Sequence, residues 1–256
     1  MTVLLALDSS TETMALALSG PAGRLYFEAV GGPQASARLV PEALALLARA
    51  GLSLADVDAI AFGCGPGAFT GLRAACAVAQ GLAFGAGKPV LSVDSLLLVA
   101  EDARQQAAAV GQPLVGVIWV AMDARIGEIY AAAYRCDTAS CDSADGDVGT
   151  WVCVDAPALY KPEALLAHWQ APAAVAGSAL TVYAEVLMAA DAVDKGQRRW
   201  PHSVSRASAL AELAAQAWAN GALLDAAEAM PIYVRNKVAQ TTAERLAARA
   251  ALPVVV

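Results

Sequence analysis

The sequence predicts an α/β fold of two similar lobes, each built on a mixed sheet flanked by helices. The first observation is an apolar strand over residues 3–8 that ends on Asp8, turns, and returns as a second apolar strand over residues 14–18. The same arrangement recurs in mid-chain, over residues 115–123 and 128–134, and the first of these strands ends on Asp123. Strands this apolar are usually covered on both faces. The repeat therefore predicts an N-terminal lobe over residues 1–110 and a C-terminal lobe over residues 111–256.

The rest of the first half alternates between strands and helices. Residues 36–50 have the spacing of a helix, with apolar positions at Leu39, Leu44, Leu46 and Leu47. Around that helix we expect a strand over residues 24–30, a strand over 59–62, a helix over 70–84 and a strand over 89–93.

The second half repeats this alternation. We expect a strand over residues 151–154, a helix over 163–169, a strand over 173–176, a helix over 180–188 and an amphipathic helix over 205–219. The acidic, small-residue run 137–150 is typical of a loop. Duplicated halves with a turn aspartate at each first hairpin resemble the fold of actin, the heat-shock ATPases and the sugar kinases. A fold alone implies no activity.

Composition excludes several classes of protein. The chain has 256 residues, 58% hydrophobic and 16% charged, which is enough apolar material for a sizeable core. No stretch reaches the roughly 20 apolar residues of a membrane-spanning helix, and the N-terminus lacks the basic region of a secretory signal. Five cysteines without a CxxC pair predict reduced thiols in a cytoplasmic protein. The net charge of −7 predicts weak RNA binding by the chain alone, because phosphates attract basic faces.

The first turn is a candidate nucleotide site. Asp8, Ser10 and Thr11 stand where the actin-like fold keeps its first phosphate and magnesium loop, and carboxylates with hydroxyls can hold a metal–phosphate group. The loop, however, lacks the glycine that lets backbone amides approach phosphate. A weak nucleotide site at these residues therefore competes with a capped hairpin turn, which we favour because Asp and Ser side chains bond their own backbone.

Other catalytic patterns are incomplete. Residues 63–68 match the dinucleotide fingerprint G-x-G-x-x-A, but three strands precede a motif that normally opens its domain. Asp94, the acidic residue at the end of the next strand, also lies farther from the motif than the usual spacing of about 20 residues. Residues 81–89 imitate a P-loop, but the spacing is wrong and no hydroxyl follows Lys88. With two histidines and no nucleophile elbow, we expect no catalytic residue and no metal site.

A surface for a protein partner is predicted around residues 65–84. Residues 65–72 form a glycine-rich loop, and the helix expected over residues 70–84 consists mostly of small residues. Small side chains let another backbone pack closely. Arg73 lies in the first turn of this helix, where the helix dipole disfavours a cation. It is therefore either solvated or paired with a carboxylate of this chain or another. The residues expected to contact a partner are Gly65, Pro66, Gly67, Phe69, Thr70, Gly71, Leu72, Arg73, Ala77 and Val78.

Several strings resemble the TsaB (YeaZ) family. The most specific is GPGAFTGLR at residues 65–73, and it falls in the right order with LDSST at 7–11, PVLSVDSL at 89–96, MDARIGEIY at 122–130 and YVRNKVAQ at 233–240. The resemblance covers nearly the whole chain. Two departures stand out: Ala68 replaces a serine usual in the family, and Ala-Ser-Ala at 35–37 replaces a His-Ser-Glu stretch.

The resemblance implies a non-catalytic subunit. It would act with a TsaD-like catalytic subunit and a TsaE-like P-loop ATPase to add a threonylcarbamoyl group to the adenosine next to the anticodon of tRNA. Pairing with the TsaD-like subunit would use the helices of the N-terminal lobe. The assembly would use ATP and magnesium, with no cofactor bound tightly by this chain, and tRNA would bind only through the assembly.

Three further expectations concern alternatives and self-association. The Ala- and Leu-rich helices 36–50 and 70–84 predict a homodimer when the chain is alone. A diverged small-molecule kinase or ATPase on the same fold, using Asp8 and the hydroxyls of Ser10 and Thr11, is the alternative function. A dinucleotide-dependent enzyme built on residues 63–68 is a third.

Overall fold

The computed structural model describes residues 2–31, 35–138, 149–169, 172–187 and 196–235. The first lobe is built on a five-stranded sheet, with an antiparallel half from the opening hairpins and a parallel half from the later strands. The strand order is β3 (Gly23–Val30), β2 (Thr13–Gly20), β1 (Leu4–Asp8), β4 (Ala59–Gly65) and β5 (Val90–Asp94).

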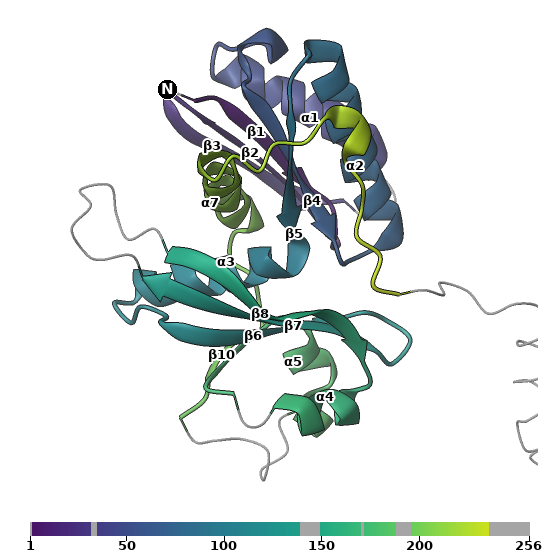
Figure 1. Ribbon diagram of the computed structural model, residues 1–256, viewed down its shortest axis with the longest axis vertical. Coiled ribbons are helices and arrows are strands. Elements are labelled where there is room, and N and C mark those ends of the chain that lie inside the picture. The colour runs from purple at the N-terminus through teal and green to yellow at the C-terminus, as the bar shows by residue number, and fades with distance from the viewer. Residues whose placement is uncertain (1, 32–34, 139–148, 170–171, 188–195, 236–256) are drawn as a thin grey trace, which may run out of the picture.

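The second lobe repeats this plan (Figure 1). Its sheet has the order β10 (Arg198–Trp200), β9 (Ala174–Ala176), β6 (Gly116–Asp123), β7 (Ile129–Thr138) and β8 (Gly149–Tyr160). Strands β6, β7 and β8 run antiparallel, and β9 and β10 extend the sheet in parallel from β6. The predicted fold class, two lobes of mixed sheets flanked by helices, is confirmed.

Helices cover both faces of the first sheet, as its apolar strands predicted. On one face, α1 (Ala35–Arg49) and α2 (Phe69–Ala86) pack against a core that includes Leu5 and Leu7 of β1. On the other face, α7 (Arg206–Ala219) packs against Leu4 and Ala6. Successive side chains of a strand point to opposite faces, so β1 supplies both cores. No helix in the described ranges is long and apolar enough to cross a membrane.

The expected lobe boundary at residues 110 and 111 separates the two sheets, but it does not separate the helices. By sequence α7 belongs to the C-terminal half, yet it packs on the first sheet (Figure 1). The helix α3 (Ser95–Ala109) touches both halves: Leu98 joins the core beneath α7, and Val99 joins the core of the second sheet. The sequence pattern identified α7 as amphipathic but did not indicate which sheet receives its apolar face.

Some elements differ from the sequence prediction. The helix expected over residues 180–188 is two short helices, α5 (Ala179–Val182) and α6 (Ala184–Leu187), separated at Tyr183; residue 188 lies outside the described residues. No sequence pattern predicted α3 or β10. Strands β7 and β8 are longer than predicted, since β7 extends into the expected loop 137–150 as far as Thr138 and β8 begins within it at Gly149. Residues 139–148 of that loop are not described. The remaining elements are α4 (Pro162–Trp169) and the short helical turns η2 (Leu54–Asp56) and η3 (Ala226–Glu228).

The four described cysteines differ sharply in exposure. Cys64, Cys76 and Cys136 are buried, whereas Cys153 is exposed. Burial raises the pKa of the Cys64 thiol to about 12, and the thiolate is the reactive form. We therefore expect iodoacetamide near neutral pH to label Cys153 well before the three buried thiols. Raising the pH toward 9 is expected to speed labelling of Cys153 while Cys64 stays protected.

Peptide mapping by mass spectrometry checks this prediction, with a sample unfolded in urea as the control in which all four thiols react. Labelling of Cys64 in the folded chain at the rate of Cys153 would contradict it.

Candidate functional site

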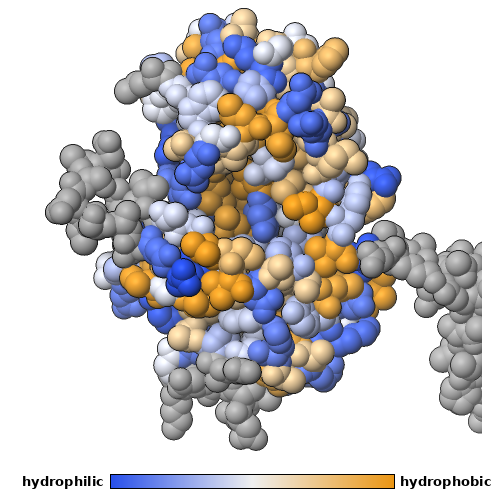
Figure 2. Space-filling view, in the orientation of Figure 1, coloured by the Kyte–Doolittle hydropathy of each residue, from blue (hydrophilic) through white to orange (hydrophobic). Residues whose placement is uncertain are grey.

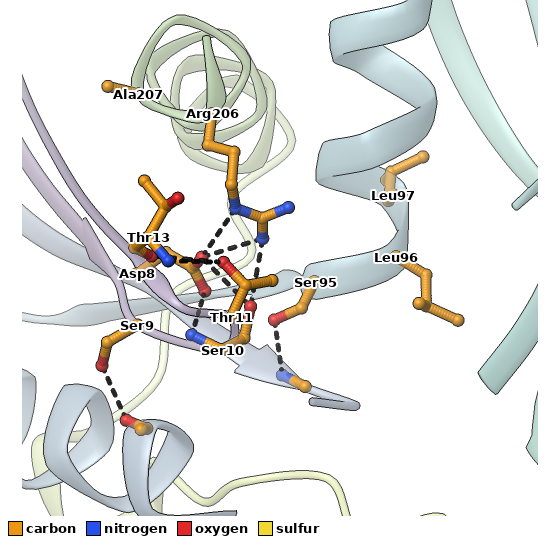
Figure 3. A network of polar contacts seen from close by, with 12 residues as sticks. Asp8, Ser9, Ser10, Thr11, Thr13, Ser95, Leu96, Leu97, Arg206 and Ala207 are labelled. Atoms are coloured by element: carbon orange, nitrogen blue, oxygen red, sulfur yellow. Dashed lines mark hydrogen bonds and ion pairs between the residues drawn. The ribbon is translucent and has the colours of Figure 1, made fainter. Parts of the chain in front are cut away.

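The first turn closes on itself through its own side chains. Asp8 Oδ1 accepts a hydrogen bond from Ser10 N at 3.3 Å, and Asp8 Oδ2 accepts one from the Ser10 hydroxyl at 3.1 Å. Thr11 Oγ1 accepts a hydrogen bond from Thr13 N at 3.2 Å (Figure 3). This is the capped turn that the sequence favoured, in which side chains replace backbone partners.

An arginine that the sequence analysis did not single out completes this turn. Arg206 Nη2 lies 2.8 Å from Asp8 Oδ2 and 3.0 Å from Ser10 Oγ, and Arg206 Nε lies 3.3 Å from the same carboxylate oxygen (Figure 3). Both charged side chains are buried, at 4% and 0% exposure. Both carboxylate oxygens of Asp8 therefore already have protein donors. A metal ion at Asp8 would have to displace a buried guanidinium.

The position of Arg206 at the start of a helix is a feature that could have been noticed in the sequence. It occupies the first turn of α7, directly after the N-cap Ser205. A cation is disfavoured at this end of a helix, so an arginine there calls for a nearby carboxylate. The carboxylate is Asp8, 198 residues away, and no sequence pattern indicated that pairing.

The glycines of the loop after β4 are needed inside this chain. A Cβ on Gly71 would lie 1.7 Å from Ser9 O, and a Cβ on Gly67 would lie 2.4 Å from Ser10 O. Gly65 has a φ of +114°, and a Cβ there would meet Ile232 O at 2.7 Å. The close approaches that the sequence assigned to a partner are therefore made by the turn after β1 and by the C-terminal segment. Contact of these glycines with a partner stays a prediction.

The residues of the predicted partner surface differ in their exposure to solvent. Gly65, Pro66, Gly71 and Leu72 are buried, whereas Thr70, Arg73 and Ala77 are exposed, and Gly67, Phe69 and Val78 are half-buried. Val78 also packs against the first core. Beyond Ala77, the outward face of α2 continues through Gly81 and Phe84, which is 83% exposed. From Thr70 to Phe84 the exposed face thus carries one charge, Arg73.

Arg73 is exposed and stacked on aromatic rings. Its guanidinium carbon lies 3.7 Å from the centre of the Phe69 ring and 5.8 Å from that of Tyr233, and Nε donates to the Tyr233 hydroxyl at 3.0 Å. Within the described part of the chain it forms no ion pair with a carboxylate. The rings hold the cation in place at the first turn of α2.

Ala68, the departure from the family's serine, is the N-cap of α2. It makes no side-chain hydrogen bond there, although its backbone N–H donates to Ser10 O at 2.7 Å. A serine at an N-cap can accept a hydrogen bond from the helix, so alanine leaves that stabilising contact out. Of the other departure, Ala35 is buried at the start of α1 and Ala37 is exposed.

Asp94 stabilises a helix. Its Oδ1 accepts hydrogen bonds from Leu96 N at 2.8 Å and Leu97 N at 3.3 Å, at the start of α3, and its Oδ2 accepts one from the Tyr134 hydroxyl at 2.7 Å. Burial raises the pKa of Asp94 in spite of these donors. This carboxylate therefore caps α3 with one oxygen and binds Tyr134 with the other. It is not available for the ribose contact that a dinucleotide site would need.

The second turn reaches across to the first. Asp123 Oδ1 accepts hydrogen bonds from Arg125 N at 2.9 Å and from the Tyr183 hydroxyl at 3.0 Å. Arg125 and Ile126 adopt the left-handed conformation, with φ of 62° and 56°, which is uncommon for residues with a Cβ and costly for Ile. This turn directs the Arg125 guanidinium to the carboxylate of Glu12 in the other lobe.

A cavity of about 520 Å³ lies between the two turns. Its walls combine hydroxyls from both lobes, such as Ser10, Ser95 and Ser178, with apolar side chains such as Leu72 and Met122. The face in Figure 2 mixes polar and apolar side chains over both lobes. Among the described residues, no group of three or more His, Cys, Asp or Glu side chains is placed to hold a metal ion.

The comparisons with known proteins now identify the family. The protein-family model for TsaD, tRNA N6-adenosine threonylcarbamoyltransferase, matches residues 32–242. The chain is 30% identical to the tRNA threonylcarbamoyladenosine biosynthesis protein TsaB of Escherichia coli K12, over 92% of this chain and 96% of that protein. The chain belongs to the TsaB (YeaZ) family. The Haemophilus influenzae TsaB is also 30% identical, over 92% of this chain and 94% of its own length.

Solved structures support the TsaB assignment over the same extent. YeaZ from Pseudomonas aeruginosa is 33% identical, with a TM-score of 0.72 over 91% of this chain and all of that one. A second Pseudomonas aeruginosa structure, described as an uncharacterized protein with similarity to peptidase YeaZ, gives 0.74 over 92% of this chain at the same identity. Of the TsaB-like string at 233–240, residues 236–240 lie outside the described residues.

Proposed function

We propose that this TsaB-family chain is a non-catalytic subunit in the synthesis of threonylcarbamoyladenosine next to the anticodon of tRNA. The observation that carries the proposal is the likeness, over nearly its whole length, to proteins named for this biosynthesis. A TsaD-like transferase subunit and a TsaE-like P-loop ATPase complete the proposed assembly in the cytoplasm.

The non-catalytic role is supported by the Asp8–Arg206 ion pair. In the alternative, a kinase or ATPase on the same fold, Asp8 with the hydroxyls of Ser10 and Thr11 would serve magnesium and phosphate. Here Arg206 supplies the positive charge that the carboxylate would otherwise take from a metal. We therefore propose that the chain binds no cofactor tightly and that ATP and magnesium are used elsewhere in the assembly.

The exposed face of α2 supports the proposed pairing. It is uncharged from Ala74 to Gly87 and presents small residues together with the exposed ring of Phe84. Interface centres are poor in charge and rich in aromatic residues. We propose that the TsaD-like subunit binds here and that the free chain forms a homodimer through the same face. We also propose that tRNA is bound only through the assembly, because the chain itself carries a net charge of −7.

We expect reconstitution to test this directly. The TsaD-like and TsaE-like proteins of the same organism, supplied with tRNA, ATP and an activated threonylcarbamoyl donor, are expected to form modified tRNA only when this chain is added. The chain alone is expected to hydrolyse no ATP. Nucleoside analysis of digested tRNA and a phosphate-release assay measure the two results.

Two outcomes count against the proposal. Full modification without the chain would show that it is not a required subunit. ATP turnover by the purified chain that disappears in the Asp8→Ala variant would show that the first turn is a catalytic site, in favour of the kinase or ATPase alternative.

A further inference from the structure

Near the end of its described part, the chain crosses once more from the first lobe to the second. After α7 it runs along α2, and it ends beside the turn between β6 and β7 (Figure 1). Residues 229–235, called the strap below, make this crossing. Four of them, Ile232, Tyr233, Val234 and Arg235, line the interlobe cavity.

The strap is anchored firmly on the first lobe. Ala229 O accepts hydrogen bonds from Gln80 Nε2 at 2.9 Å and from Cys76 Sγ at 3.3 Å. Ile232 N donates to Cys64 O at the end of β4, at 2.7 Å. These contacts use the backbone of the strap and lie against α2 and β4, so they belong with the first core.

Among the described residues, the hydrogen bonds from the strap to the second lobe all come from one side chain. Arg235 Nη2 donates to Glu128 Oε2 at 2.7 Å, to Ala124 O at 2.9 Å and to Arg125 O at 3.2 Å. The Arg235 and Glu128 side chains are 13% and 26% exposed. Arg125 and Glu12 also form an ion pair between the lobes at this cavity, but their side chains are 70% and 80% exposed, so water screens them strongly.

We propose that the strap is a releasable tie between the lobes, and that breaking the Arg235–Glu128 contact opens the interlobe cavity. In the part of the chain that the structure describes, backbone hydrogen bonds fix one end of the strap to the first core, and the Arg235 guanidinium holds the other end to the second lobe. Local opening in proteins starts where few contacts hold a segment.

Hydrogen exchange of the full chain tests the release. In Glu128→Gln, a near-isosteric change that removes the charge, amides of residues 229–235 and 123–128 are expected to exchange about tenfold faster, since the ion pair with Arg235 becomes a weaker hydrogen bond to a neutral amide oxygen. Amides of β1 are expected to keep their rates. Lys161→Gln is the matched control, because Lys161 Nζ lies 3.9 Å from Glu128 Oε1 but does not touch the strap.

Methionine oxidation tests the opening of the cavity. Met122 lines the cavity, Met14 is fully buried in the first core, and Met230 is 64% exposed. With hydrogen peroxide, Met122 is expected to oxidise severalfold faster in Glu128→Gln than in the parent chain, while Met230 reacts fast and Met14 slowly in both.

Arg235→Met, which keeps the apolar stem and removes all three hydrogen bonds, is expected to behave like Glu128→Gln in both measurements. Unchanged exchange of the strap and unchanged Met122 oxidation in both variants would overturn the proposal. A parallel rise in β1 exchange and Met14 oxidation would also overturn it, because the strap would then be part of the global fold and not separately releasable.

Discussion

Replacing Arg206 with methionine is expected to destabilise the folded chain by about 3–5 kcal/mol, the usual result of removing one partner of a buried ion pair. Asp8 is fully buried, and without Arg206 the Ser10 hydroxyl is the one donor that remains to its Oδ2 among the described residues. Methionine has a similar length, so lost packing contributes little. Urea unfolding followed by circular dichroism measures the change in the free energy of unfolding.

The double variant Asp8→Asn, Arg206→Met is expected to recover a large part of this loss, because no unpaired charge then stays buried. Arg38→Met is the control: its i,i+4 pair with Glu42 is solvent-accessible, so a change within about 0.5 kcal/mol is expected. A loss in Arg206→Met as small as that of the control would show that Asp8 is hydrated and free for a ligand.

The second large effect is expected at the proposed partner surface. Ala77→Glu places a charge on the exposed face of α2, where a partner would bury it unpaired. We expect a folded chain whose affinity for the TsaD-like subunit falls about a hundredfold, since a loss near 3 kcal/mol corresponds to that change in Kd. Co-elution measures pairing, and light scattering is expected to show loss of self-association as well.

Ala79→Glu is the matched control on the same helix. Ala79 is fully buried in the first core, so this variant is expected to unfold, as circular dichroism would show. A folded Ala77→Glu chain that pairs normally would place the interface elsewhere. An Ala77→Glu chain that unfolds like Ala79→Glu would return this face of α2 to the core.

Strand and helix patterns predicted most of the fold, because its apolar faces are long and regular. The two similar hairpins, whose first strands end on Asp8 and Asp123, were enough to predict two lobes. The helix α3 was missed although its first residues, Ser95 and Leu96, fall within a string that resembles the family. The strand β10 has only three residues, two of them arginines, so it has no apolar pattern to detect.

The candidate site was predictable only in part. Local chemistry predicted the capped turn at Asp8, because Ser10 is two residues away. It did not predict Arg206, since a contact between residues so distant in sequence depends on how α7 returns to the first sheet. The same limit applies to Gly71: its sequence context suggested room for a partner, whereas the folded chain fills that room with Ser9.

The return of α7 also constrains how the protein is made. The face of the first sheet that carries Leu4 and Ala6 lacks its main cover until residues 206–219 have left the ribosome, although Leu98 of α3 already packs on it. During most of synthesis the first lobe therefore exposes apolar sheet surface, and Asp8 has no Arg206 to pair with. Nascent chains in such a state tend to bind chaperones or to aggregate. A fragment that stops at residue 110 lacks α7 altogether, so this face of its sheet would stay exposed. Cutting the gene between the two sheets thus yields a half that a separately supplied second half must complete.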